Sequence, residues 1–74
     1  MEDKLRFIFA DTLGATQDQI TDATTYSEFP NWDSVAHMAL IAAIEQSFDI
    51  MIDAEDVIDM SSFSKAKQIV AKYL

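Results

Sequence analysis

Asp33 and Ser34 are the residues of this sequence whose types and spacing most favour chemistry, because they stand where a helix is predicted to begin. Asp33 is a good N-cap, since its carboxylate can accept from the free backbone N–H groups of the first turn. Ser34 then takes the first helical position, with its hydroxyl outward. Unpaired N–H groups and the positive end of the helix dipole favour a phosphate there. The pattern predicts covalent modification of Ser34 by a phosphate-linked group.

The sequence offers no other catalytic constellation. Its 74 residues include no cysteine and one histidine, which excludes a disulfide framework, a thiolate zinc site and a histidine cluster. No set of nucleophile, base and orienting group is visible, so we expect a protein that is not an enzyme and has no resident metal. His37 lies one helical turn after Ser34. We interpret it as a solvated or half-packed side chain, with the mouth of a pocket or a partner contact as alternatives.

Charge is unevenly distributed along the chain. The formal net charge is −8, from 13 acidic and 5 basic residues, and there is no Lys or Arg from Phe7 to Ser64. Such a surface repels nucleic acid and anionic membranes and attracts partners with basic patches, although solubility alone is an alternative explanation. No apolar run approaches the ~20 residues of a membrane span, and no signal peptide is visible. We expect a cytoplasmic monomer without nucleic-acid or membrane partners.

Apolar periodicity predicts the elements that position Ser34. Stripes of apolar residues, with capping residues at their ends, predict helices over about 3–13, 34–48, 54–58 and 62–73. Three are longer and the third is short, with Asp53 as its predicted cap. One domain over residues 1–74 follows from the length. The expected fold is all-α, a small irregular antiparallel four-helix bundle.

The predicted connection from Ala15 to Trp32 is long for so small a domain. Its spaced apolar residues indicate that it packs down against the bundle, and we expect Trp32 to anchor it. Phe7 lies off the stripe of the first helix, and we expect it to pack beneath this connection, with a partner contact as the alternative. The anchors in the connection are Ile20, Tyr26, Phe29 and Trp32.

The helix over 34–48 is apolar on two sides. One arc is the predicted core face and contains Leu40, Ile41, Ile44 and Phe48. Val35 and Met38 lie on a different arc, beside Ser34. A bundle of this size can hardly bury a helix all round, so we interpret Val35 and Met38 as a second, partly exposed patch. The alternative is that both cover the long connection.

Asp33-Ser34, followed by an apolar residue in a helix that continues to Glu45 and Phe48, resembles the core of an acyl carrier protein. The resemblance covers nearly the whole chain. It implies that a phosphopantetheinyl transferase using coenzyme A esterifies Ser34 with 4'-phosphopantetheine, and that Asp33 helps to orient that enzyme and its metal-bound coenzyme A. The thiol of the arm then carries acyl groups as thioesters.

The resemblance also implies partner and cargo surfaces. Acyl-transferring, condensing or ligase enzymes with basic docking patches are expected at Val35, Met38, Glu45, Asp49, Asp53, Glu55 and Asp56. An acyl pocket is expected among Leu40, Ile44, Ile58, Phe63 and Ile69.

The sequence departs from the commonest family pattern. Trp32 stands where a small residue often precedes Asp-Ser, and Val35 replaces the usual Leu or Met. Carboxylates common in fatty-acid-synthesis members are absent at Ala36, Ala39 and Gln46. This favours a specialised pathway, such as polyketide, modified-lipid or glycan synthesis, over fatty acid synthesis, which stays open. The alternatives are an aminoacyl or peptidyl carrier and an unmodified helical docking adaptor.

Overall fold

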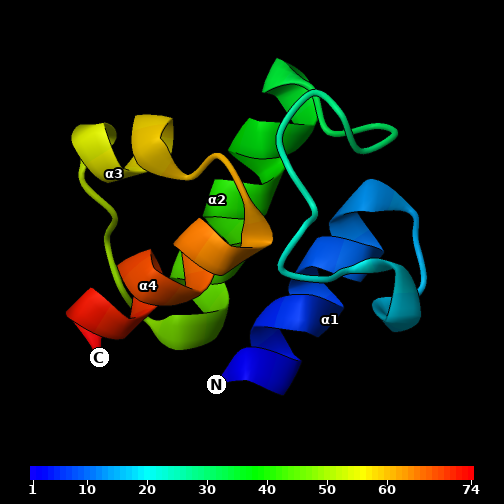
Figure 1. The fold of residues 1–74 in the computed structure, drawn as a ribbon. Helices are drawn as coiled ribbons and strands as arrows, with labels where there is room; N and C mark the ends of the chain where they lie inside the picture. Colours follow the sequence, from blue (N-terminus) through cyan, green and yellow to red (C-terminus); the bar gives the residue numbers. More distant parts are fainter.

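A computed structural model describes all 74 residues as four α-helices and one short 3₁₀ turn. Three helices form the bundle, and the short α3 lies beside the N-terminal half of α2 (Figure 1). Both termini lie at the end of the molecule opposite the start of α2. The expected all-α bundle of three longer helices and one short helix is confirmed. Its elements are α1 (Glu2–Leu13), η1 (Gln17–Gln19), α2 (Ser34–Phe48), α3 (Ala54–Asp59) and α4 (Phe63–Tyr73).

The helix ends follow the capping residues of the sequence, with one exception. The Asp33 carboxylate accepts from the backbone N–H of Ala36 at 2.9 Å, and Ser62 caps α4 in the same way. Gly14 ends α1 with a φ of 67°, a left-handed conformation that glycine adopts without a Cβ penalty. Asp53 stands at the N-cap of α3, but its side chain makes no capping hydrogen bond, so that expectation was wrong.

The core is one cluster of 16 buried apolar residues. At its centre the Phe9 ring packs edge-to-face on Trp32 and Phe63, with centroids 5.3 and 5.1 Å apart. Trp32 is 1% exposed, so its predicted role as the anchor of the long connection is confirmed. Phe7 was predicted to pack and is instead 56% exposed. The predicted core face of α2 is buried at Leu40, Ile41 and Ile44.

The long connection is held against the link between α3 and α4. The N–H of Tyr26 donates to the carbonyl of Ser61 at 2.8 Å, and the N–H of Phe63 donates to that of Thr24 at 3.0 Å. These two bonds make a short antiparallel bridge, which places Tyr26 at the edge of α3. None of the helices has the length and apolar character that a membrane span requires.

Candidate functional site

Ser34 is exposed and is the first residue of the 15-residue helix α2. The chain reaches it in an extended conformation, with φ −115° and ψ −172° at Asp33. Because Asp33 caps the amide of Ala36, the helix begins at a fixed place and the Ser34 side chain has a defined position on its first turn. Sequence and structure agree on this start.

The surroundings of Ser34 suit a phosphate diester. The N–H groups of Ser34 and Val35 lie in the first turn and have no intrahelical acceptor. The first turn of α2 carries no acidic residue, and the carboxylate of the preceding Asp33 is engaged with the amide of Ala36. A shallow hollow lined by the segment 26–34, with the carboxylates of Glu28 and Asp33 among its polar side chains, opens beside Ser34. The residues present therefore fit a group joined through phosphate to Ser34.

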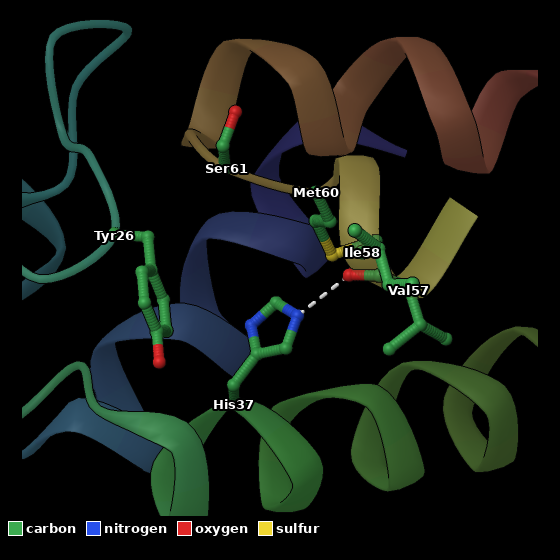
Figure 2. A pocket seen from close by; sticks show the side chains of 6 residues that line it. All are labelled: Tyr26, His37, Val57, Ile58, Met60 and Ser61. Atoms are coloured by element: carbon green, nitrogen blue, oxygen red, sulfur yellow. Dashed lines mark hydrogen bonds between the residues drawn. The ribbon is translucent and has the colours of Figure 1, made fainter. Parts of the chain in front are cut away.

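His37 is bound through both ring nitrogens. Trp32 Nε1 donates to His37 Nδ1 at 3.1 Å, and His37 Nε2 lies 2.8 Å from the carbonyl oxygen of Val57. An indole N–H only donates and a carbonyl only accepts, so this arrangement requires the His37 tautomer that carries its proton on Nε2. Figure 2 shows this bond crossing from α2 to α3. His37 is half-buried, as expected, but no pattern in the sequence indicates its partner on α3.

A half-open cleft of about 220 Å³ lies beside this bond. Figure 2 shows its lining side chains, which come from the long connection, α2, α3 and the link to α4. Of the five residues expected to form an acyl pocket, the cleft is lined only by Ile58. The other four, each at most 3% exposed, lie in the packed core and are Leu40, Ile44, Phe63 and Ile69. The lining consists of Tyr26, His37, Val57, Ile58, Met60 and Ser61.

The residues expected to bind partners fall into two groups. Val35 and Met38 are 78% and 61% exposed and lie on the turns of α2 next to Ser34. Three acidic residues are also exposed, namely Asp49, Asp53 and Glu55.

The other two acidic residues make internal bonds. Glu45 is half-buried and accepts from the N–H of Ile52 at 2.9 Å. Asp56 is 9% exposed and accepts from Lys72 Nζ at 2.8 Å and from the Tyr73 hydroxyl. The hydrogen bond from Lys72, then that from Tyr73, lowers the pKa of Asp56, and the same pairing raises the pKa of Lys72. Asp56 thus ties α3 to α4 as an ionised carboxylate.

Comparison with known proteins bears on this site. The sequence profile of the family described as "Phosphopantetheine attachment site" matches residues 3–70. An acyl carrier protein of Buchnera aphidicola subsp. Baizongia pistaciae is 32% identical over 74 residues, which is 100% of this chain and 95% of that protein. The chain belongs to the acyl carrier protein family. The carrier is also 29% identical over 72 residues to the acyl carrier protein of Akkermansia muciniphila, covering 97% of this chain and 90% of that protein.

Membership of the family implies a covalently attached 4'-phosphopantetheine on this carrier. It also implies interaction with a phosphopantetheinyl transferase and with acyl-handling enzymes, because family members are carriers that other enzymes load and unload. A relative from Clostridium perfringens, also an acyl carrier protein, is 38% identical over 56 residues, covering 76% of this chain and 74% of that protein.

Proposed function

We propose that Ser34 is the attachment residue of this carrier and that the chain shuttles acyl groups as thioesters without catalysing turnover itself. The observation that carries the proposal is the exposed Ser34 hydroxyl at the capped start of α2, in a first turn that has free N–H groups and no acid. The bound arm would supply a flexible thiol. The protein residues supply its anchor and a surface that partner enzymes recognise.

The attachment step balances as a phosphoryl transfer from coenzyme A. The Ser34 oxygen attacks the phosphorus that bears pantetheine, the phosphoanhydride bond breaks, and adenosine 3',5'-bisphosphate leaves. The serine proton passes to a base of the transferase. Asp33 Oδ1 is engaged with the Ala36 amide, and we assign Asp33 the additional role of orienting the transferase and its metal-bound coenzyme A.

Val35 and Met38 are proposed as the apolar part of the surface on which the transferase and acyl-transferring, condensing or ligase enzymes dock. Side chains so exposed contribute little to the fold and are available to a partner. Around them the carrier is anionic, with a net charge of −8, which favours partners with basic docking patches. Among the acids, the free carboxylates of Asp49, Asp53 and Glu55 suit this role better than the internally bonded Glu45 and Asp56.

A specialised biosynthetic pathway, such as polyketide or modified-lipid synthesis, is proposed over fatty acid synthesis. The support is the outer side of α2, where Ala39 and Gln46 provide no carboxylate for a basic partner. Ala36 also lacks a carboxylate, but it is half-buried and packs against the core. An aminoacyl or peptidyl carrier would use the same arm. Loading assays with adenylating enzymes and amino acids, set against acyl-transferring enzymes and acyl coenzyme A, separate these cargo classes.

The test is the intact mass of the chain after incubation with coenzyme A and a broad-specificity phosphopantetheinyl transferase. The wild type is expected to gain one arm, Ser34→Ala none, and the control Ser61→Ala, which removes another exposed serine hydroxyl, one arm. Circular dichroism establishes that each variant is folded. A folded wild type that gains no mass contradicts the proposal and leaves an unmodified docking adaptor.

A further inference from the structure

α3 is the least anchored helix of the bundle. It has six residues, and the only one that is buried is the polar Asp56. Ile58 is 79% exposed and Val57 is half-buried. Because the helix buries so little apolar surface, its place depends on hydrogen bonds to its neighbours.

Those bonds reach α3 from two sides. On the α4 side, Lys72 and Tyr73 bind the Asp56 carboxylate. On the α2 side, His37 Nε2–H donates to the carbonyl of Val57. This carbonyl is one of the last four of a short helix and so has no intrahelical donor, which leaves it free to accept from the imidazole.

The imidazole is fixed from more than one direction. Trp32 Nε1–H holds Nδ1, which selects the tautomer that donates to Val57. The Tyr26 ring meets the His37 ring edge-on, with centroids 5.5 Å apart and an interplanar angle of 77°. His37 therefore joins Trp32, at the buried end of the long connection, to α3 in one polar link. Figure 2 shows the half of this link that runs from His37 to Val57.

The half-open cleft beside this link is small. Its volume is about 220 Å³. Its lining includes Met60, which is 1% exposed, and the core contains fully buried Leu40 and Ile44, so the interior adds no ready space. A long chain that enters between α2 and α3 must first separate His37 from Val57.

We propose that His37 is a specificity-determining latch: by holding α3 on α2, it restricts the sheltered cargo of this carrier to short acyl groups and leaves longer chains outside the bundle. The proposal rests on the attachment of the arm to Ser34, one helical turn from His37. It assigns the chain-length limit to one hydrogen bond rather than to the core residues.

The experiment loads the wild type with butanoyl and decanoyl phosphopantetheine from the corresponding coenzyme A thioesters and measures two quantities. The first is the change in the backbone amide chemical shifts, measured by nuclear magnetic resonance and compared with the carrier whose arm is unacylated. The second is the rate of thioester cleavage by hydroxylamine. For the wild type, the decanoyl chain is expected to leave the amides of Leu40 and Ile44 unchanged. Its thioester is expected to be cleaved as fast as free decanoyl pantetheine.

A matched pair of variants isolates the bond to α3. His37→Asn keeps an acceptor for Trp32 at the position of Nδ1 but does not reach Val57, whereas His37→Gln places its amide near Nε2 and restores the donor. In His37→Asn the decanoyl chain is expected to shift the Leu40 and Ile44 amides and to slow thioester cleavage several-fold. His37→Gln is expected to behave as the wild type does.

The outcomes separate the latch from the carrier function. A wild type in which decanoyl shifts the core amides and slows cleavage as strongly as in His37→Asn overturns the latch, even though the arm is present. Intact mass, measured first, shows whether any arm was added, and an unmodified wild type overturns the carrier proposal instead. The comparison of butanoyl with decanoyl in the wild type needs no variant to fold.

Discussion

The indole Nε1–H of Trp32 donates to Nδ1 of His37 at 3.1 Å. This bond accounts for the bulky residue that stands before Asp33, since the same indole anchors the long connection against Phe9 and orients the imidazole toward α3. The chain contains one tryptophan and one histidine, so each partner gives a single, unambiguous signal in a nuclear magnetic resonance spectrum.

Trp32→Phe tests this bond. The substitution keeps an aromatic ring against Phe9 but removes the donor to His37 Nδ1, and the smaller ring leaves a gap. We expect the free energy of unfolding in urea to fall by about 1–3 kcal/mol. The ¹⁵N chemical shifts of the His37 ring are expected to indicate a mixture of tautomers instead of the Nε2–H tautomer alone. Unchanged stability together with an unchanged tautomer would show that the bond does not hold the imidazole.

Two variants of Asp33 distinguish its effect on the stability of the fold from its effect on the modification of Ser34. Asp33→Ala removes the cap on Ala36 and should lower the free energy of unfolding by about 1 kcal/mol, whereas Asp33→Asn retains an accepting side-chain oxygen and should be nearly neutral. Both should be modified more slowly if the carboxylate helps to orient the transferase. Normal modification of Asp33→Asn would restrict the residue to its capping role.

Val35→Ala and Met38→Ala test the docking surface. Both side chains are highly exposed, so each change should alter the free energy of unfolding by about 0.5 kcal/mol or less. Each should lower the kcat/KM of the transferase. Met51→Ala is the control, because Met51 is 85% exposed but lies beyond the opposite end of α2 from Ser34. If Met51→Ala lowers the kcat/KM of the transferase equally, exposed apolar area in general, rather than the patch of Val35 and Met38, governs docking.

Asp56→Asn should destabilise the carrier in a pH-dependent way. The folded state lowers the pKa of Asp56 from its ordinary value of 3.8, so the carboxylate contributes stability that is fully present above pH 3.8. That contribution disappears as the pH falls through the lowered pKa. The difference in urea midpoint between wild type and variant is therefore expected to be large at neutral pH and to shrink below pH 3.8.

Asp59→Asn provides the control for Asp56, because Asp59 is an exposed carboxylate on the same helix. It should change the midpoint little at either pH. A difference for Asp56→Asn that stays constant as the solution is acidified would contradict the assigned pairing with Lys72.

Local signals in the sequence were sufficient to predict the helices and the residue at which α2 begins. Apolar spacing and caps act within a few residues, so the structure retains the predicted start of α2 at Asp33 and ends or begins its other long helices at residues of capping type, Gly14 and Ser62. The spacing of Val35 and Met38 on an arc away from the core face likewise agreed with their exposure. These features depend on helix geometry alone.

Features that depend on contacts between distant segments escaped sequence reasoning. No pattern relates His37 to a carbonyl 20 residues later, or Asp56 to Lys72 and Tyr73 across the α3–α4 link. The cleft could not be placed for the same reason. Apolar residues at helical spacing describe a core, and close packing decides which of them border an opening, as Ile58 does and Leu40 does not.

The most direct test of the central claim is to locate the arm on the modified chain by fragmentation mass spectrometry after proteolysis. The phosphopantetheine mass is expected on fragments that contain Ser34 and on no fragment that lacks it, with the peptide bearing Asp33 and Ser34 shifted by one arm. A phosphopantetheine group found on any other serine, or a chain left unmodified by a transferase that modifies another carrier in the same mixture, would contradict the account.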